Sequence, residues 1–415
     1  MAALCRYIAA AALLQATIAG PANGTDLIVH HGWSSPAEIA ALNVLKGEME
    51  ERGHRWIPLA VPHTNAQDMD ILGLIEAGSP PHVFLEPSPN IYRTLEQQGR
   101  TVSLDQQFTD SGLLDVLPDV VRQSITVDGQ IVKIPATIHV DAMIYYNRNV
   151  AAAYGVEPEG WTTLDEMWTD LQALSSKGHH PIAIGAEPWQ IGYLFHSLVV
   201  TLGGAELYSQ LYAPVPDPAA FNDTRLLDAF SWLRRFSTLA TQEAANQPWN
   251  VATNAVISGD ALMQIHGDWM KGEWSAAGRT EQDYGCLGLP GALGVPVTVD
   301  AWGLLGGTSP EIAEAQHLFA ALAVDQTVQA EFARAKGSTP IRMDARGQLD
   351  HCSHLVLGAL ERPGFAVPTP HLIAPPEWIE AVWSVAAEFW ADRQMTPEDA
   401  INALRIAGAQ QAPAP

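Results

Sequence analysis

The chain of 415 residues carries 46 acidic and 22 basic side chains, which give a formal net charge of −24. A protein this acidic is a poor candidate for binding nucleic acid or an anionic membrane surface. Its length exceeds what one small core needs and indicates two domains.

The first residues have the composition of an export signal. Arg6 provides a positive charge, residues 7–20 are mostly Ala, Leu and Ile, and residues 22–24 place small side chains where a signal peptidase cleaves. We therefore expect residues 1–24 to be a signal peptide and the mature protein to lie in the periplasm. The apolar stretch is shorter than the roughly 20 residues of a spanning helix, so we expect no membrane anchor.

Short apolar runs then alternate with amphipathic segments along the chain, which predicts an α/β protein. Strands are expected at 26–30, 55–61, 82–85, 142–146 and 182–184. Helices are expected at 37–52, 68–77, 161–178, 190–202, 223–241 and 250–258. The segment 161–178 opens with a Thr-x-x-Asp/Glu type cap, and Gly259 would end the helix at 250–258.

The segment 249–274, WNVATNAVISGDALMQIHGDWMKGEW, combines indoles, carboxylates and glycines. A pyranose has an apolar face of C–H bonds and a rim of hydroxyls, which suit flat indole rings and hydrogen-bonding carboxylates. Trp269 with Asp268 beside it supplies both. We expect Trp249 to pack at a helix start and Trp274 to lie on the outer face of the next helix. The alternative is that the tryptophans are core residues and that Asp268 only caps a helix.

Five further segments carry motifs in a characteristic order, at 29–50, 128–147, 181–190, 295–305 and 336–344. Together with 249–274 they resemble the extracellular solute-binding proteins of bacterial ABC sugar importers (family 1), most of all the glucose/mannose-type sugar-binding proteins. The resemblance extends along nearly the whole mature chain. It implies a protein that captures a mono- or small oligosaccharide and delivers it to a membrane permease, without a cofactor and as a monomer.

The resemblance also implies an α/β, two-lobed periplasmic-binding-protein fold of type II. The N-terminal lobe would comprise 25–135 and 301–340, and the C-terminal lobe 136–300 and 341–415. The chain would cross between these discontinuous lobes near 134–138, 296–301 and 339–344. A ligand would bind in the cleft between the lobes and stabilise a hinge closure.

Carried over position by position, the resemblance implies a set of sugar contacts. These are Trp33, Glu38, His139, Trp189, Asp268, Trp269, Asp300, Lys336 and His371. Several have structural alternatives: a core histidine satisfied by backbone for His139, a helix-dipole role for Glu38, and an exposed hinge lysine for Lys336.

Two loops depart from the family pattern. The first loop, HHGWSSPAE, keeps one of two stacking tryptophans, so that a platform is missing or replaced by His31. The loop FLEPSPN has Glu86 as its only charge where relatives often have a lysine. We include Glu86 among the expected contacts, and its charge disfavours a substrate carrying phosphate or carboxylate at that point. Where the family has an arginine after its histidine, this chain has Val140 and Asp141.

Two cysteines, Cys286 and Cys352, remain after export. An even pair in an oxidising compartment is most simply a disulfide, and the alternative is two separate thiols. The 14 histidines show no HxxxH spacing and the cysteines no CxxC spacing, so we expect no metal site.

Two other functions remain possible from the sequence. A two-lobed binder of a peptide or amino acid would need a charged partner for each terminus of its ligand, whereas the matched positions are mainly aromatic and acidic. A glycoside-processing enzyme could draw a carboxylate pair from Glu38, Glu86, Asp268 and Asp300. The sequence contains no nucleophile elbow, phosphate loop or zinc signature, so we expect binding without catalysis.

Overall fold

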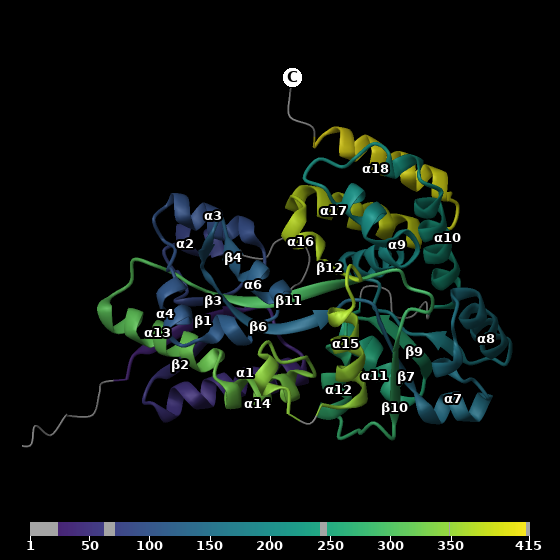
Figure 1. Cartoon of the computed structure of the whole chain (residues 1–415). Coiled ribbons are helices and arrows are strands. Elements are labelled where there is room, and N and C mark those ends of the chain that lie inside the picture. The colour runs from purple at the N-terminus through teal and green to yellow at the C-terminus, as the bar shows by residue number, and fades with distance from the viewer. Residues whose placement is uncertain (1–23, 62–70, 241–246, 348, 412–415) are drawn as a thin grey trace, which may run out of the picture.

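A computed structural model describes residues 24–61, 71–240, 247–347 and 349–411 (Figure 1). The expected signal peptide lies outside these residues except for Gly24, as does the beginning of the helix expected at 68–77. Among the described residues, no helix is both long enough and apolar enough to span a lipid bilayer.

The N-terminal lobe is built on three parallel strands in the order β3-β1-β2. They are β1 (Asp26–His31), β2 (Arg55–Ala60) and β3 (Val83–Leu85). The helices of this lobe are α1 (Pro36–Glu51), α2 (Ile71–Glu76), α3 (Pro89–Gln97), α4 (Asp105–Asp110), α5 (Leu113–Val116), α6 (Asp119–Ile125), α13 (Pro310–Ala323) and α14 (Gln326–Lys336). A small hairpin joins β4 (Thr126–Val127) to β5 (Gln130–Ile131). Leu27 and Val29 of β1 are fully buried, so the apolar residues of this strand form part of the core.

The C-terminal lobe is built on a second sheet in the order β10-β7-β9-β8. Its strands are β7 (Met143–Asn147), β8 (His180–Ile182), β9 (Ala261–His266) and β10 (Tyr284–Gly288). Its helices are α7 (Arg148–Tyr154), α8 (Leu164–Ser176), α9 (Pro188–Leu211), α10 (Thr224–Leu239), α11 (Trp249–Ser258), α12 (Met270–Ala276), α15 (His351–Glu361), α16 (Pro370–Ile373), α17 (Pro376–Ala391) and α18 (Pro397–Ala409). Short 3₁₀ turns in the described part of the chain occupy Pro158–Gly160, Ala220–Asn222 and Met343–Ala345.

Two long antiparallel strands, β6 (Lys133–Val140) and β11 (Val295–Leu304), run from one lobe to the other (Figure 1). β11 pairs with β3 near one end and with β12 (Ala366–Pro368) near the other. Ile138 of β6 also forms a bridge to Thr339. The three segments expected to cross between the lobes therefore lie side by side. Every residue of β6 is buried.

Most expected elements are confirmed to within a few residues. Gly259, with a φ of 87°, ends α11 as expected, because a left-handed conformation suits glycine. The strand expected at 182–184 is shifted to His180–Ile182, and the helix expected at 190–202 extends as α9 to Leu211. The expectation for Trp274 was wrong. This side chain is 1% exposed and packs against Tyr284, at a distance of 5.2 Å between ring centroids.

The cap expected at the start of α8 is confirmed and supports a first test. Thr163 Oγ1 accepts a hydrogen bond from the Glu166 amide, and Glu166 Oε2 accepts one from the Thr163 amide. Replacing Thr163 with alanine is expected to lower the free energy of unfolding by about 1 kcal/mol, since the Glu166 amide loses its hydrogen-bond acceptor. Urea denaturation measures this loss. Thr169→Ala, at an exposed position within the same helix, is the control, and an equal loss in both variants would contradict the cap.

Candidate functional site

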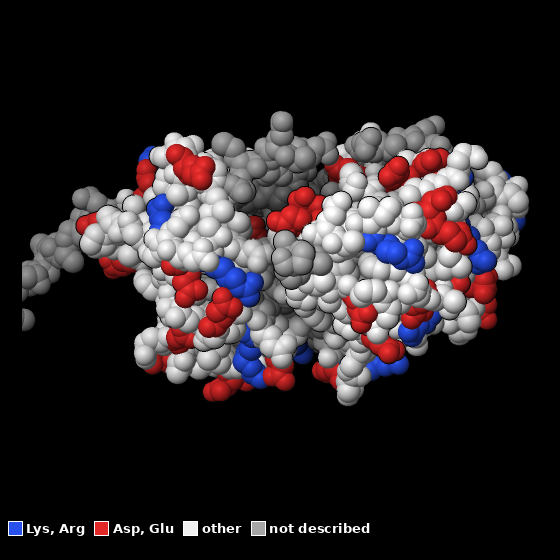
Figure 2. Space-filling model, turned by 90° about the horizontal axis from the view of Figure 1, so that it is seen from above, with Lys and Arg blue, Asp and Glu red and all other residues white. Residues whose placement is uncertain are grey.

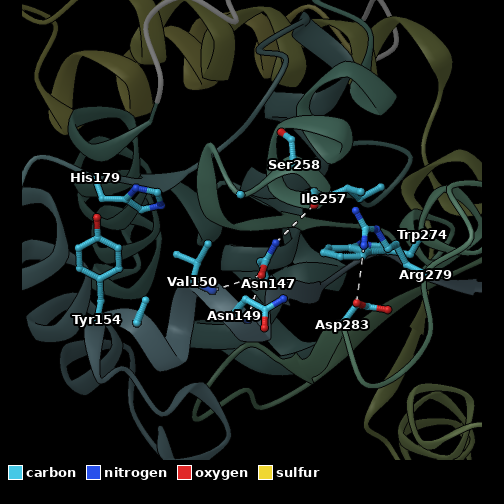
Figure 3. A pocket seen from close by; sticks show the side chains of 12 residues that line it. Asn147, Asn149, Val150, Tyr154, His179, Ile257, Ser258, Trp274, Arg279 and Asp283 are labelled. Carbon is cyan, nitrogen blue, oxygen red and sulfur yellow. Dashed lines mark hydrogen bonds and ion pairs between the residues drawn. The ribbon is translucent and has the colours of Figure 1, made fainter.

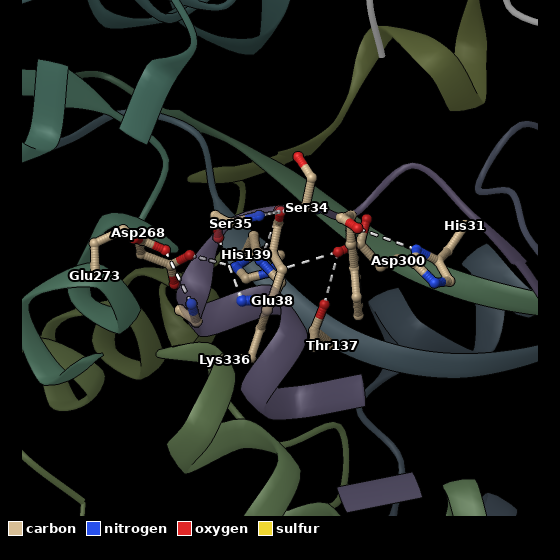
Figure 4. A network of polar contacts seen from close by, with 12 residues as sticks. His31, Ser34, Ser35, Glu38, Thr137, His139, Asp268, Glu273, Asp300 and Lys336 are labelled. Carbon is tan, nitrogen blue, oxygen red and sulfur yellow. Dashed lines mark hydrogen bonds and ion pairs between the residues drawn. The ribbon is translucent and has the colours of Figure 1, made fainter. Parts of the chain in front are cut away.

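Polar side chains meet where β6 and β11 pair between the lobes (Figure 4). His139 Nδ1 lies 2.5 Å from Oδ1 of Asp268, and its Nε2 lies 3.4 Å from Oδ2 of Asp300. Thr137 Oγ1 donates a hydrogen bond of 3.0 Å to the same Asp300 oxygen. The imidazole is 1% exposed, and its contact with Asp268 joins a strand between the lobes to the C-terminal lobe. We call these side chains, with Glu38 and Lys336 described below, the polar cluster.

The surroundings of His139 favour its charged form. Burial by itself lowers the pKa of His139, but the carboxylates of Asp268 and Asp300 outweigh burial and hold this pKa above its ordinary value. For Asp300, burial raises the pKa, whereas His139, Lys336 and Thr137 together hold it below its ordinary value. His139 and the carboxylates of Asp268 and Asp300 therefore form a set of hydrogen-bonding groups at fixed positions, of which Asp300 is partly exposed.

Asp268 does not cap the following helix, so that alternative was wrong. The residue at the cap position of α12 is Trp269, which makes no side-chain capping bond, and the Asp268 carboxylate is directed to His139 instead. The two partners are 129 residues apart in the chain. A short polar side chain before a helix usually accepts a hydrogen bond from an amide of the first turn. The Asp268 carboxylate instead binds a charged side chain from a distant segment.

Glu38 and Lys336 form a second part of the cluster. The Glu38 Oε2 atom accepts hydrogen bonds of 2.9 Å from the amides of Ser34 and Ser35, which completes a capping box at the start of α1. Its Oε1 atom lies 3.7 Å from Lys336 Nζ. Lys336 is 2% exposed, so the alternative of an exposed hinge lysine was wrong. Glu38 thus has both a structural role in α1 and a charged partner.

Trp33 lies against the core of the N-terminal lobe. Its side chain is 7% exposed and packs on Trp302 and Phe332, with ring centroids 5.7 and 6.0 Å away. Lys336 Nζ lies 4.9 Å from the centroid of the Trp33 ring. His31, considered as a replacement platform, is also buried, and its Nδ1 lies 3.1 Å from the Trp33 carbonyl oxygen. Most of the surface of Trp33 is therefore covered by protein.

Aromatic side chains of the C-terminal lobe gather beside the polar cluster. The Trp269 ring stands edge-on to His139, with centroids 5.2 Å apart, and Trp189 stands edge-on to Tyr193 at 5.6 Å. Tyr193 also lies 5.9 Å from Trp269. The Trp189 indole nitrogen donates a hydrogen bond of 3.0 Å to Glu187, which orients this half-buried ring. We call the rings of Trp189, Tyr193 and Trp269, together with four rings that lie beside them in this lobe, the aromatic wall; these further rings are Trp249, His266, His371 and Trp383.

Four members of the aromatic wall were not expected from the sequence. They are Tyr193, Trp249, His266 and Trp383. Tyr193 follows Trp189 by four positions on α9, so helical periodicity could have placed both on one face. No local signal connects Trp383, on α17, with this site. Of the expected contacts, His371 joins the wall, 5.3 Å from Trp383 and 6.5 Å from Tyr193 between centroids.

Several ring N–H groups of the wall have no protein partner among the described residues. They include Nε1 of Trp269 and Nε1 of Trp383, and the buried Nε2 of His266 is in the same situation. Burial lowers the pKa of His266 to about 3, which keeps this imidazole neutral. A buried polar atom without a partner costs free energy, so these atoms are suited to bind the hydroxyls of a ligand.

Glu86 lies outside the polar cluster. It follows β3, and its Oε1 atom accepts a hydrogen bond of 2.6 Å from the Ser88 amide. Lys133 Nζ donates to the carbonyl oxygen of the neighbouring Pro87, at 2.6 Å. Burial lowers the pKa of Lys133 to about 8, although the nearby Glu86 charge opposes this shift. Glu86 is the only charged residue of its loop. Lys133, the first residue of β6, therefore places an amino group beside this loop.

The outer surface shows how the two lobes meet. A groove runs between them when the molecule is seen from above (Figure 2). Acidic and basic side chains are scattered over both sides of this groove. The excess negative charge is therefore not gathered into one patch on this face.

A separate cavity of about 380 Å³ lies on the flank of the C-terminal lobe (Figure 3). Its lining includes Asn147, Tyr154, His179 and Arg279, and the rings of Tyr154 and His179 stack at 4.9 Å. None of the side chains expected to contact a sugar lines it. This cavity is thus distinct from the polar cluster and the aromatic wall.

The sulfur atoms of Cys286 on β10 and Cys352 on α15 are bonded to each other. The expected disulfide is confirmed, and the alternative of two separate thiols is excluded. Because β10 belongs to the second sheet, the bond attaches α15 to the C-terminal lobe.

The chain is similar in sequence to other binding proteins along most of its length. A probable sugar-binding periplasmic protein of Mesorhizobium japonicum is 28% identical over 387 residues, covering 90% of this chain and 91% of the relative. An uncharacterized ABC transporter extracellular-binding protein of Pyrococcus horikoshii is 24% identical over 331 residues, covering 77% of this chain and 72% of the relative.

The fold is that of a two-lobed binding protein of type II. A solved structure described as a chitin oligosaccharide binding protein superposes with a TM-score of 0.80 at 19% identity, over 94% of this chain and 99% of that chain. The sequence pattern of the bacterial extracellular solute-binding proteins matches residues 55–327, which is more than half of the chain. The protein therefore belongs to the family of bacterial extracellular solute-binding proteins.

Proposed function

We propose that this protein binds a sugar between its two lobes and delivers it to the permease of an ABC importer. The observation that carries the proposal is the position of the polar cluster beside the aromatic wall, at the strands that join the lobes. Carboxylates and imidazoles supply hydrogen bonds at fixed positions, and the indole rings supply flat apolar surface for the C–H faces of a pyranose. The names of the relatives agree with a sugar as the ligand.

The proposal extends to the organisation and location of the protein. Residues 25–135 and 301–340 form one moving body, and residues 136–300 and 341–415 the other. Residues 1–24 are an export signal, and the mature chain acts in the periplasm as a monomer. Ligand binding stabilises the closed arrangement of the lobes, because only there can both lobes contact the same ring.

The same site argues against hydrolysis of the bound sugar. The four carboxylates named as enzyme candidates all have partners: Glu38 caps α1, Asp268 and Asp300 flank His139, and Glu86 binds the Ser88 amide. A general acid with a raised pKa facing a ligand is the feature that glycoside hydrolysis requires. The carboxylate of Asp300 shows the opposite shift.

A panel of mono- and disaccharides, added while tryptophan fluorescence is followed, tests the proposal. At least one sugar is expected to give a saturable change, and chromatography after long incubation is expected to recover that sugar intact. Turnover of a sugar would show an enzyme. Silence with every sugar, together with a response to amino acids or peptides, would show a different class of ligand.

Trp189 is expected to carry much of the affinity. Replacing it with alanine removes a half-buried indole that Glu187 holds in position, so we expect affinity for the best sugar to fall about 30- to 1,000-fold. Isothermal titration measures this loss. Trp168→Ala is the control, because Trp168 is also half-buried but packs on Trp232, away from the cluster. Equal affinity in the Trp189 variant and the control would contradict the assignment.

A further inference from the structure

Helix α12 is held firmly in the C-terminal lobe at two of its residues. Lys271 Nζ donates to Asp350 Oδ2 at 2.7 Å and to Ser353 Oγ at 2.6 Å. Trp274 is buried against Tyr284 of the second sheet. These contacts fix the position of the helix relative to its own lobe.

The two residues between these anchors contact the N-terminal lobe instead. A Cβ atom on Gly272 would lie 2.4 Å from the carbonyl oxygen of Lys336 and 2.6 Å from Cβ of Ala37. A Cβ atom on Gly337 would lie 2.1 Å from the Gly272 amide nitrogen. The backbone of α12 therefore touches the start of α1 and the end of α14 directly, which only glycines on both sides permit.

Glu273 adds a polar contact at the same place. Its Oε1 atom accepts a hydrogen bond of 3.2 Å from the Ala37 amide, in the first turn of α1 (Figure 4). The side chain is buried, and burial raises its pKa. A carboxylate at the N-terminus of a 16-residue helix satisfies an amide that has no partner within the helix. This bond joins residues 236 positions apart and exists only when the lobes are in contact.

The contact is continuous with the polar cluster. Lys336 presents its carbonyl oxygen to Gly272 and its ammonium group to Glu38. Asp268, which binds His139, lies four residues before Gly272 on the same segment. A movement of α12 away from α14 would therefore also separate groups of the cluster.

We propose that α12 is a closure clasp, in which the Gly272–Gly337 contact and the Glu273–Ala37 hydrogen bond hold the two lobes together and set how far the cleft closes. This proposal rests on the proposed function, because the ligand whose affinity the clasp affects is the proposed sugar. Its effect on the arrangement of the lobes needs no ligand and can be measured separately. The absence of a side chain at position 272 is thus a requirement of closure rather than of the helix.

Gly272→Ala tests the clasp in the full-length mature protein. Gly272 lies within α12 and its φ is not positive, so alanine fits the helix without backbone strain and is the better helix former. Its methyl group would meet backbone atoms of the other lobe. We expect a larger radius of gyration by small-angle X-ray scattering without sugar, and an affinity for the best sugar that is about 5- to 150-fold weaker. Gly337→Ala is unsuitable, because its φ of 79° would strain any side chain.

The matched control is Gly358→Ala, an exposed helical glycine on α15 whose added Cβ would meet no atom within 4 Å. A folded Gly272 variant with the scattering and affinity of this control would overturn the clasp. If the Gly272 variant does not fold, Glu273→Ala decides: expansion supports the clasp, and an unchanged radius of gyration refutes it. If the wild type binds no sugar, the proposed function fails, and the scattering comparison still decides the clasp.

Discussion

Replacing His139 with leucine is expected to lower the free energy of unfolding by about 3–5 kcal/mol, because a buried carboxylate would lose its charged partner. His139 is 1% exposed and lies 2.5 Å from Asp268, whose own side chain is buried. Leucine has a similar volume but no hydrogen-bond donor, so the loss reports the polar contact rather than a cavity. Urea denaturation near neutral pH measures the difference.

The double variant His139→Leu/Asp268→Asn separates the charge from the packing. Removing the carboxylate as well leaves no uncompensated buried charge, so the double variant is expected to recover a large part of the lost stability. A double variant as unstable as the single variant would mean that His139 matters through its packing alone.

The pH dependence follows from the direction of the His139 shift. Its pKa in the folded protein lies above the ordinary value of 6.5, so the folded state binds the proton more tightly than the unfolded chain does. This contribution is fully present below a pH of about 6.5 and is lost as the pH rises through the folded pKa. The wild type should therefore lose stability relative to the double variant as the pH rises above about 6.5. Parallel stability curves would contradict the shift.

Removing the disulfide is expected to cost about 4 kcal/mol in the free energy of unfolding, from the loop that it closes. Cys286 and Cys352 are 66 residues apart, so the bond restricts a large part of the unfolded chain. Cys286→Ser/Cys352→Ser, which leaves no unpaired thiol in the mature chain, is compared with the oxidised wild type by urea denaturation.

The reduced wild type provides the control for this prediction. It should be destabilised by about the same amount as the double serine variant, because both lack the same covalent constraint. A loss below about 1 kcal/mol in both would mean that the unfolded chain gains little freedom when the bond is absent. The disulfide would then serve mainly to position α15, which carries Ser353, a partner of Lys271.

Local patterns predicted the start of α8 and the end of α11 well. The capping box at Thr163 and the left-handed Gly259 depend on residues within four positions of each other, so a short stretch of sequence contains all the relevant partners. The same reasoning failed for Asp268. Its position before α12 suggested a cap, whereas its partner His139 comes from a distant strand.

Trp33 shows the limit of reading exposure from neighbours in sequence. It follows a strand and lies among polar residues, and the family resemblance implied that its side chain contacts a ligand. The folded chain brings Trp302 and Phe332 against its ring, and both come from segments about 270 or more residues further on. Polar neighbours in the chain therefore did not indicate how much of the ring the folded protein covers.

The sequence by itself determined the α/β alternation through local periodicity, and the family with its three crossings through motifs in a fixed order. It favoured a disulfide because the mature chain has an even pair of cysteines, and the structure excluded two separate thiols. Only the tertiary structure decided which side chains share the site. Tyr193 and Trp383 meet across α9 and α17, and Gly272 touches Gly337 across the lobes. Such contacts depend on how finished elements pack, since a helix or strand has several surfaces and its own sequence does not specify which distant segment covers each one.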